Sequence, residues 1–310
     1  MSTVDVNGRA VEVSNVDKVL FPDDGVTKGD VIDYYRRVAD RVLPQLRDRP
    51  LVMRRFPDGI REDGFYQKDT PDHFPDWIRT VTLEKKEGGT VTHVVCDDAA
   101  TLVYLADQGT IELHTLLAPA GRPDRPDRLV LDLDPSTDDL TPVVEGARVI
   151  RDLLDDLGVT GFVGSTGSRG VHVHVLLDGA EGFEAARSSA RRLAEAVVAT
   201  DPGRFTVEQS KQARGDRLFV DTLRNSFGQH AIAPYSLRAR DGAPIAVPLT
   251  WEEATASSFD PRAVTIRNVF RRLGAQGDDP WSGMGRHRYS IGRISERLDR
   301  REKRSSAGDA

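Results

Sequence analysis

Two aspartates separated by one residue, Asp132 and Asp134, are the residues in this sequence best suited to chemistry. They belong to the segment RLVLDLDPS, residues 128–136, which indicates a buried strand that Pro135 ends because proline lacks a ladder donor. Side chains alternate along a strand, so the two carboxylates share one face and two leucines share the other. Neighbouring carboxylates repel each other, and a divalent cation would relieve that repulsion. The pattern predicts a metal site, although two exposed acids at a sheet edge would look the same.

A second informative segment is GSTGSRGVHVHV, residues 164–175. Its glycines allow backbone N–H groups to point at an anion, Thr166 and Ser168 offer hydroxyls, and Arg169 offers a two-pronged guanidinium. The segment is not a Walker loop, because the spacing and the lysine are wrong. His172 follows on the next predicted strand and could carry charge near neutral pH. We therefore predict that this segment binds a triphosphate.

A third acid, Asp221, ends the apolar run of another predicted strand, Leu218–Val220. Three arginines bracket it in the sequence: Arg214, Arg217 and Arg224. Either the arginines neutralise Asp221 as a structural ion pair, or Asp221 binds a metal while the arginines bind phosphates. Further along, the segment APYSLRAR places Arg238 in a short predicted strand, where it could also contact phosphate.

The elements that must position these residues alternate between helix and strand, which predicts an α/β or α+β fold with mixed sheets. Residues 4–13 alternate around Asn7-Gly8, a strong hairpin signal. Thr27 and Asp30 have the spacing of a capping box at a helix start. Other strands are predicted at 51–54, 91–95, 111–113 and 171–177. Helices are predicted at 27–46, 97–106, 142–157, 183–199 and 261–273.

A proline-rich link, APAGRPDRPD at residues 118–127, is the strongest candidate boundary. We predict a single bilobed domain over residues 1–290, with an N-terminal lobe of about 1–126 and a catalytic core of about 127–290. The tail is basic and predicted to be helical over 286–304, and the last residues, within a partly disordered segment 291–310, are expected to fray. The connection 54–77 is long, aromatic and charged, and loops of that length are usually functional.

The composition describes a globular protein of 310 residues with 38% hydrophobic and 30% charged residues. No apolar run is long enough to span a membrane and the N-terminus has no signal-peptide pattern, so we expect no membrane partner and a cytoplasmic location. The single cysteine, Cys96, excludes intramolecular disulfides and thiolate zinc clusters. The net charge of −6 argues weakly against nucleic acid, because it does not report where the charges lie.

The segments taken in order resemble the archaeo-eukaryotic primase superfamily and, more closely, the polymerase domain of the bacterial end-joining ligase D family. The resemblance rests on ten segments that follow the family's order: SNVDKVLFP, TKGDVIDYY, RRFPDGI, GFYQK, IELH, PDRLVLDLDPS, STGSRGVH, RLFVDTLRN, APYSLR and TIRNVFRRL. It covers roughly residues 10–285, and agreement over such a span is more specific than any single motif. It implies a two-lobed primase-polymerase fold with an RRM-like catalytic core.

The resemblance also implies a set of catalytic and nucleotide-binding residues. Asp132, Asp134 and Asp221 would bind two divalent ions, Mn²⁺ or Mg²⁺, that join a nucleotide's phosphates to a primer 3′-hydroxyl. The incoming triphosphate would be bound by Thr166, Ser168, Arg169, His172, Arg214, Arg224 and Arg238. His114, in IELH, matches a family histidine near the sugar and the metal, which fits a preference for NTPs over dNTPs.

The resemblance implies two further sets of residues, which would bind DNA. Asn15, Lys18 and Lys28 match the pocket that takes the 5′-phosphate at a gap or break, although two lysines would otherwise be ordinary surface charges. Phe65 and Tyr66 match the aromatic position that stacks on DNA, and stacking of this kind gives about 1–3 kcal/mol per base. The alternative for this pair is two core anchors under the long connection.

The function implied is template-dependent nucleotidyl transfer in the end-joining repair of double-strand breaks: gap filling, end extension and, as an option, priming. The expected partners are DNA ends, gaps or primer-templates. The chain has no Lys-x-Asp-Gly ligase signature, so we expect a separate DNA ligase and end-binding protein.

Two rival functions fit parts of the sequence. DLDPS also fits the start of haloacid-dehalogenase-type phosphatases, in which the first aspartate is a nucleophile. Such an enzyme should have this strand near the start of a doubly wound fold, but here more than 120 residues precede it. The other rival is a non-catalytic protein that binds DNA ends through the 5′-phosphate pocket, which the presence of all three acids disfavours.

Overall fold

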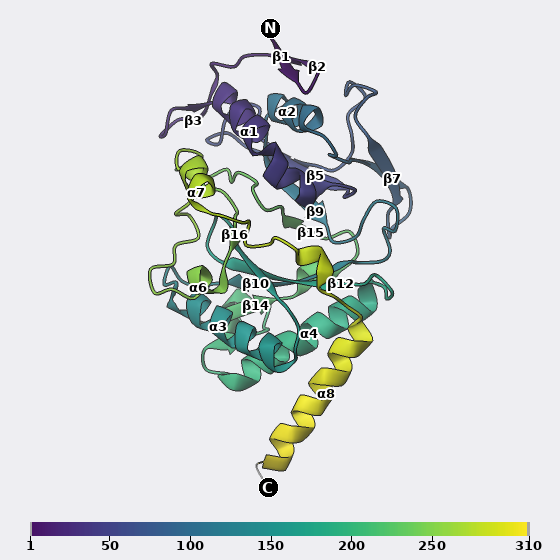
Figure 1. The fold of residues 1–310 in the computed structure, drawn as a ribbon, viewed down its shortest axis with the longest axis vertical. Coiled ribbons are helices and arrows are strands. Elements are labelled where there is room, and N and C mark those ends of the chain that lie inside the picture. The colour runs from purple at the N-terminus through teal and green to yellow at the C-terminus, as the bar shows by residue number, and fades with distance from the viewer. Residues whose placement is uncertain (1, 309–310) are drawn as a thin grey trace. The chain divides into compact units, whose positions relative to one another are not determined.

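The structure, a computed structural model, describes residues 2–308, and at residues 305–308 it describes the backbone alone. Contacts group the chain into two compact units (Figure 1). Unit 1 comprises Met1–Pro123, His230–Val247 and Arg262–Gly277, and unit 2 comprises Asp124–Gln229, Pro248–Pro261 and Asp278–Ala310. The chain thus returns to unit 1 twice after the proline-rich link, whereas the sequence suggested a single crossing. That the two units form one bilobed domain remains a prediction.

Unit 1 begins with the predicted hairpin of β1 (Ser2–Val6) and β2 (Arg9–Val13). Its turn residues, Asn7 and Gly8, have φ angles of 54° and 84°, as a type I′ turn requires. A second short hairpin, β3 (Val19–Phe21) and β4 (Val26–Thr27), leads into α1 (Lys28–Leu46). The predicted capping box of α1 is confirmed, because the side chains of Thr27 and Asp30 each accept a hydrogen bond from the other's backbone N–H.

The main sheet of unit 1 is antiparallel, with strand order β15-β9-β5-β6. Its strands are β5 (Leu51–Arg55), β6 (Phe65–Gln67), β9 (Thr110–Leu116) and β15 (His230–Ile232). The unit also holds α2 (Ala99–Asp107) packed on α1, and the hairpin of β7 (Thr80–Glu84) and β8 (Thr90–Val94). Because β15 pairs with β9, the segment after residue 229 belongs to unit 1.

Unit 2 is built on a mixed sheet with strand order β13-β14-β10-β12-β11-β16, and β17 pairs with β12. Its strands are β10 (Arg128–Asp134), β11 (Phe162–Ser165), β12 (Val171–Leu177), β13 (Phe205–Thr206), β14 (Leu218–Asp221), β16 (Pro248–Leu249) and β17 (Arg288–Tyr289). The central strand β10 is antiparallel to both neighbours, β12 and β14. This is not the doubly wound parallel sheet that the phosphatase alternative requires.

Two helices, α3 (Thr141–Asp156) and α4 (Phe183–Thr200), pack against β10 and against each other (Figure 1). Gly146 of α3 lies so close to the sheet that a Cβ there would meet the side chain of Leu218 at 2.5 Å and that of Leu133 at 3.3 Å. The helix therefore covers the leucine face of β10. Because side chains alternate along a strand, the carboxylates of Asp132 and Asp134 lie on the opposite face.

The remaining helical elements are short except for the last. They are α5 (Lys211–Arg214), η1 (Leu223–Asn225), α6 (Trp251–Ala254), α7 (Val269–Ala275), η2 (Met284–Arg286) and α8 (Ile291–Gly308). In unit 2, α8 packs on α4, where Arg192 pairs with Asp299 at 2.6 Å. Residues 305–308 continue α8 and residues 309–310 lie outside the described part of the chain, so the expected fraying of the last residues remains a prediction. None of the helices among the described residues is long and apolar enough to cross a membrane.

Two predicted elements are wrong in unit 1, and backbone pairing explains both. The helix predicted at 261–273 begins at Val269, because the N–H of Ile245 bonds the carbonyl of Val264 and the N–H of Ile266 bonds that of Ala243. These bonds and the bridge between Pro244 and Thr265 pair residues 264–266 with residues 243–245, so the same backbone groups cannot form the bonds of a helix. Arg238 is not in a strand, since the only ladder contact at that point is a bridge between Leu237 and Ile245.

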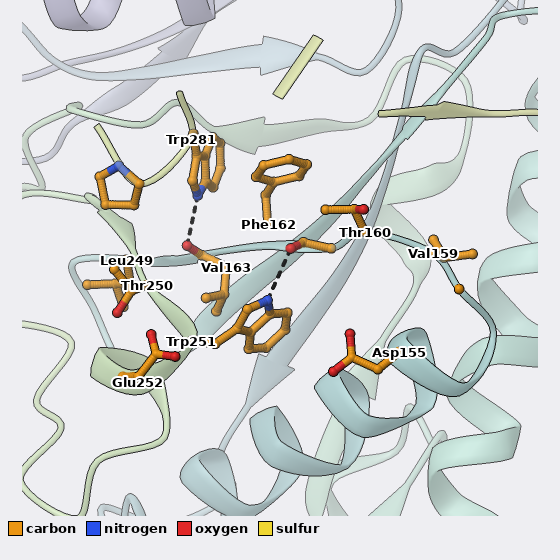
Figure 2. A pocket seen from close by; sticks show the side chains of 13 residues that line it. Asp155, Val159, Thr160, Phe162, Val163, Leu249, Thr250, Trp251, Glu252 and Trp281 are labelled. Atoms are coloured by element: carbon orange, nitrogen blue, oxygen red, sulfur yellow. Dashed lines mark hydrogen bonds between the residues drawn. The ribbon is translucent and has the colours of Figure 1, made fainter. Parts of the chain in front are cut away.

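A cavity of about 550 Å³ lies beside β11 in unit 2 (Figure 2). The indole N–H groups of Trp251 and Trp281 donate to the carbonyls of Gly161 and Val163, at 3.1 and 2.9 Å. The strand β16 is only two residues long, so it pairs with only part of β11. The two indoles bond further backbone carbonyls at this edge of β11. None of the predicted site residues lines this cavity, so it is not the predicted active site.

The position of β10 depends on a buried amide. The side chain of Asn225 accepts from the N–H of Val130 at 2.8 Å and donates to the carbonyl of Val130 at 2.7 Å, and it also donates to Thr222. Asn225 is 1% exposed. It thus replaces a strand partner for β10 beyond the end of its pairing with β14.

We predict that Asn225→Ala lowers the free energy of unfolding by about 2–4 kcal/mol, because two buried backbone groups of Val130 lose their partner. Asn268→Ala is the matched control: its amide also bonds two backbone groups, those of Thr265 and Ala263, but it is only half-buried and water can replace it. Chemical denaturation of both variants measures the difference. Equal losses would contradict the role given to Asn225.

Candidate active site

The three acids that are far apart in sequence meet on the sheet of unit 2. Asp132 of β10 lies directly opposite Asp221 of β14 on one side and opposite His172 of β12 on the other. Asp134 is two residues further along β10 and so shares their face. Asp132 is 9% exposed, whereas the side chain of Asp134 is 36% exposed. The sheet therefore creates a row of charged side chains with Asp132 at its centre.

Asp134 pairs with two of the arginines that the sequence assigned to phosphate. Its Oδ1 atom accepts from Arg169 Nη2 at 2.9 Å, and its Oδ2 atom lies 3.6 Å from Arg214 Nη1. The guanidinium of Arg214 stacks on the ring of Phe219, 3.6 Å from its centroid, and donates to the carbonyls of Glu208 and Gln209. Arg214 is thus fixed in place, so it offers Asp134 a preorganised positive charge.

Asp132 pairs with the other two predicted phosphate ligands of the row. Its Oδ2 atom lies 3.3 Å from His172 Nε2 and 3.6 Å from Arg224 Nε. Burial alone would raise the pKa of the Asp132 carboxyl, but the charges and hydrogen bonds of His172 and Arg224 lower it below its ordinary value. Asp132 is therefore an ionised carboxylate.

Asp221 behaves in the opposite way. Burial and the negative charge of Asp132 across the ladder raise the pKa of the Asp221 carboxyl, although the N–H of Leu223 donates to it at 2.7 Å. Two carboxylates that face each other with their pKa values pushed apart form a strained pair that a cation between them would relax. The donor set also suits a hard divalent ion, since it consists of carboxylate oxygens.

As they stand, no three His, Cys, Asp or Glu side chains in the described part of the chain form a group that could hold a metal ion. Asp134 is turned towards Arg169 and Arg214, and Asp132 towards His172 and Arg224. The carboxylates would have to exchange these partners for a metal. The residues fit such an ion in type and in shared face.

The loop before β12 is held by its own threonine. Thr166 Oγ1 donates to the carbonyl of Gly170 at 3.0 Å and accepts from the N–H groups of Ser168 and Gly170. Gly170 has no space for a side chain, since a Cβ there would lie 1.9 Å from the carbonyl oxygen of Leu133 on β10. The predicted phosphate loop is therefore fastened against the strand that carries the acids, and Thr166 shapes it from within.

In unit 1 the predicted 5′-phosphate residues come together at the start of α1. The N–H of Lys18 bonds the carbonyl of Asn15 at 3.0 Å, and the N–H of Lys28 bonds the carbonyl of Lys18 at 2.8 Å. Asn15 has a φ angle of 51°, which makes the tight turn possible. The three side chains predicted for the 5′-phosphate therefore lie on adjoining backbone, next to the positive end of a helix dipole.

The two lysines of this group differ strongly in their surroundings. Lys18 is 38% exposed and pairs with Asp58 at 2.6 Å. Lys28 is buried, and its Nζ atom pairs with the buried Asp107 at 2.7 Å and bonds Ser14 Oγ at 3.3 Å. Asp107 was not predicted, and nothing in its sequence context marks it. A phosphate that binds Lys28 would have to share it with Asp107.

Phe65 and Tyr66 lie on β6, the edge strand of the sheet, and are 43% and 52% exposed. The alternative of two core anchors is therefore wrong. Successive side chains of a strand point to opposite faces, so the two rings do not form one stacking platform. Tyr66 shares its face with His114 and His230, whose ring centroids lie 5.7 and 5.5 Å away, and Arg54 is 5.4 Å from its ring centroid.

His114 and Arg238 are joined by Glu112, a residue that the sequence analysis did not single out. His114 Nε2 lies 3.1 Å from Glu112 Oε2, and Arg238 Nε lies 3.1 Å from Glu112 Oε1. Glu112 and His114 are two residues apart on β9, so their shared face could have been read from IELH. The predicted nucleotide ligands therefore fall into two sets: His114 and Arg238 in unit 1, and the other members in unit 2.

Comparison with known proteins gives consistent matches. The family described as "LigD, primase-polymerase domain" matches residues 27–281. The multifunctional non-homologous end joining DNA repair protein LigD of Mycobacterium tuberculosis is 34% identical over an alignment of 277 residues, and the match covers 86% of this chain and 36% of that protein. The bifunctional non-homologous end joining protein LigD of Bacillus subtilis is 33% identical over 269 residues, which are 86% of this chain and 43% of that protein.

Among solved structures, the polymerase domain of Mycobacterium tuberculosis ligase D in complex with DNA is similar, with a TM-score of 0.79 and 33% identity. The match covers 86% of this chain and 96% of that domain. The chain spans less than half of the length of the curated relatives above, so it corresponds to one of their parts.

We predict that Asp221→Asn raises the free energy of unfolding at neutral pH by about 0.5–1 kcal/mol, because it removes the repulsion from Asp132. The raised pKa of Asp221 sets the sign: the destabilisation appears as the pH rises above the pKa of the unfolded chain and is complete above that of the folded state. The gain in the free energy of unfolding should therefore fade at acidic pH, where Asp221 is protonated.

The variant Asp132→Asn should instead lower the free energy of unfolding, since Arg224 and His172 lose their counter-ion. Denaturation curves over a pH series test both signs, and destabilisation by Asp221→Asn would refute the like-charge pairing.

Proposed function

The chain belongs to the primase-polymerase domain family of ligase D, and from that premise we propose that it is a DNA-directed nucleotidyltransferase. It extends primers, fills gaps and extends broken ends during end joining, with priming as an additional activity. The observation that carries the proposal is the pair of facing carboxylates, Asp132 and Asp221, with Asp134 on the same face. Repelling acids of this kind are maintained at a cost in stability, which function explains better than folding does.

Members of this family are metal-dependent, and we assign Asp132, Asp134 and Asp221 to the binding of two Mn²⁺ or Mg²⁺ ions. When bound, such ions lower the pKa of an attacking 3′-hydroxyl and neutralise a leaving pyrophosphate. The low pKa of Asp132 keeps it available as an anionic ligand at neutral pH.

The arginines and His172 have a second task in this proposal. Arg169, Arg214 and Arg224 now neutralise the acids, and a bound ion would take over that role. The guanidinium groups would then be available to the triphosphate, which suits their two-pronged geometry. His172 can donate from Nε2 to a phosphate oxygen in the same exchange. Ser168 offers its hydroxyl from the loop that Thr166 shapes.

The residues of unit 1 are assigned to the binding of DNA and of the nucleotide's sugar and phosphates. Asn15, Lys18 and Lys28 are assigned to the 5′-phosphate of a gap or break, and Tyr66, with Phe65 on the other face of its strand, to base stacking. His114 and Arg238 are assigned to the ribose and phosphates of the nucleotide, with NTPs preferred over dNTPs. The solved relative is described as bound to DNA, which supports a DNA substrate here.

The relatives also bear on the partners. The curated relatives are multifunctional or bifunctional end-joining proteins more than twice as long as the matched part, which supports the expectation that a ligase and an end-binding protein act on the same ends. We propose that these activities reside in separate proteins, and that the reaction takes place in the cytoplasm with the chromosome.

Asp132→Ala combined with Asp134→Ala is expected to abolish primer extension with Mn²⁺, because the metal ligands are lost, while DNA binding largely survives. Extension of a labelled primer-template and a parallel binding assay measure the two effects. Undiminished synthesis would refute the metal assignment. A protein that binds ends but never extends them, even unmutated, would instead be the non-catalytic end binder.

Lys28→Ala should abolish the preference for a 5′-phosphorylated gap over a hydroxyl gap, and it should also destabilise the fold by about 3–5 kcal/mol because Asp107 is left buried and unpaired. The double variant Lys28→Ala with Asp107→Ala separates the two effects: stability should largely return while the phosphate preference stays lost. Gap-filling assays with both substrates, together with thermal denaturation, test this. A double variant that recovers the preference would exclude Lys28 from phosphate binding.

A further inference from the structure

The backbone donors at the start of α1 in unit 1 already have partners. The N–H of Lys28 bonds the carbonyl of Lys18 at 2.8 Å, and the N–H of Gly29 bonds the carbonyl of Val16 at 2.8 Å. The N–H of Asp30 bonds the hydroxyl of the N-cap residue at 3.2 Å. Helix starts commonly bind phosphate through such N–H groups. Because these three are already bonded, a phosphate at this place must be bound mainly by side chains.

Ser14 is a side chain of this group that the sequence analysis did not assign. It is half-buried and directly precedes Asn15, which is assigned to the 5′-phosphate. Lys28 Nζ donates to Ser14 Oγ at 3.3 Å. A lysine ammonium has three donors and no acceptor, so the hydroxyl of Ser14 must be the acceptor in this bond. Its own proton points elsewhere, and no hydrogen bond in the described part of the chain uses that proton.

Asp107, the last residue of α2, holds both Ser14 and Lys28. Its Oδ1 atom accepts from the N–H of Ser14 at 2.8 Å and from Lys28 Nζ at 2.7 Å. The side chains of Lys28 and Asp107 are only 9% and 8% exposed, so water screens this ion pair little. Because its N–H is bonded to Asp107, Ser14 can offer a ligand only its hydroxyl as a donor. The buried carboxylate thus fixes the backbone from which that hydroxyl projects.

We propose that Ser14 is a further ligand of the 5′-phosphate, and that its hydroxyl donates to a phosphate oxygen while it accepts from Lys28. The inference rests on the proposed function, since it adds a residue to the 5′-phosphate pocket assigned there. Asp107 and Lys28 orient Ser14 before a phosphate binds, which lowers the entropic cost of binding. The bonds to Asp107 and Ser14 leave one of the three N–H groups of the Lys28 ammonium for the same phosphate. Every residue of this arrangement belongs to unit 1.

The hydroxyl of Ser14 adds to the discrimination between two kinds of DNA end. A 5′-phosphate is charged, and a hydrogen bond to a charged group is stronger than one between neutral groups. A 5′-hydroxyl end is neutral and lacks the phosphate oxygens. Ser14 therefore stabilises the complex with a phosphorylated end more than the complex with a hydroxyl end.

A purely structural role for Ser14 makes a different prediction. In that case its hydroxyl would only complete the bonds of Lys28, and Ser14→Ala would lower stability without changing the discrimination between the two ends. The variant Ser14→Thr retains the hydroxyl and so tests whether that group, rather than the serine as such, is needed.

The experiment is equilibrium binding of two gapped DNA duplexes that differ only in the gap, which ends in a 5′-phosphate or in a 5′-hydroxyl. Fluorescence anisotropy without nucleotide or metal gives both dissociation constants, so no catalysis is needed. In Ser14→Ala the ratio of the constant for the hydroxyl gap to that for the phosphorylated gap should fall about tenfold, the effect of one lost hydrogen bond to a charged group. Ser14→Thr should keep the ratio of the unmutated protein.

The matched control is Thr27→Ala, which removes a hydroxyl from the same helix start. Thr27 Oγ1 accepts from the N–H of Asp30 at 3.2 Å and donates to Asp30 Oδ2 at 2.9 Å, so its proton is already used. This variant should lower the thermal midpoint, because α1 loses its cap, and leave the ratio unchanged. An unchanged ratio in Ser14→Ala, or an equal fall in Thr27→Ala, would overturn the proposal.

The same measurements separate this proposal from the proposed function. If the unmutated protein bound both gaps equally, the 5′-phosphate pocket would fail and the role of Ser14 with it. If it preferred the phosphorylated gap but extended no primer, the polymerase function would fail. The ratio in Ser14→Ala would then still decide whether Ser14 binds the phosphate.

Discussion

The repulsion between Asp132 and Asp221 is the interaction on which the site in unit 2 depends. Antiparallel pairing of β10 with β14 places the two carboxylates directly opposite each other, at a position where burial removes much of the water that would screen them. The protein compensates by placing His172 and Arg224 beside Asp132 and placing Arg169 and Arg214 beside Asp134. The pKa values of the two facing acids are driven in opposite directions as a result. Such an arrangement stores electrostatic energy in the folded protein.

The same construction recurs in unit 1 with other residues. There, cross-strand pairing aligns Tyr66, Arg54 and Glu112, and a buried carboxylate again holds an arginine and a histidine. In both units a strand carries two polar side chains two residues apart, so that they share one face, and the neighbouring strands supply their partners. The hydrogen-bond register of a sheet is rigid, which makes it a suitable frame for groups that must be placed accurately.

Membership of the ligase D primase-polymerase family agrees with this charge pattern. The pattern also shows why the net charge alone says little about where the charges lie. The net charge of −6 hides the fact that four cationic or ionisable side chains, those of His172, Arg224, Arg169 and Arg214, gather around Asp132 and Asp134. Lys28 of unit 1 is also paired with an acid, because its charge is balanced by the carboxylate of Asp107. Both cases hold a cation in position by pairing it with a fixed anion.

The sequence by itself determined the elements whose signals are local. The Asn7-Gly8 hairpin, the Thr27 capping box, the face shared by Asp132 and Asp134, and the order of the family motifs depend on residues close together in the chain, and the structure agrees with the first three. Only the tertiary structure decided what depends on pairing between distant segments. Four features follow from contacts across many residues: Asp221 lies opposite Asp132, Asp107 neutralises Lys28, Asn225 supports Val130, and residues 264–266 pair with residues 243–245 instead of forming a helix. Such contacts leave no periodic trace in the sequence, because a partner's identity is set by the strand register and not by spacing along the chain.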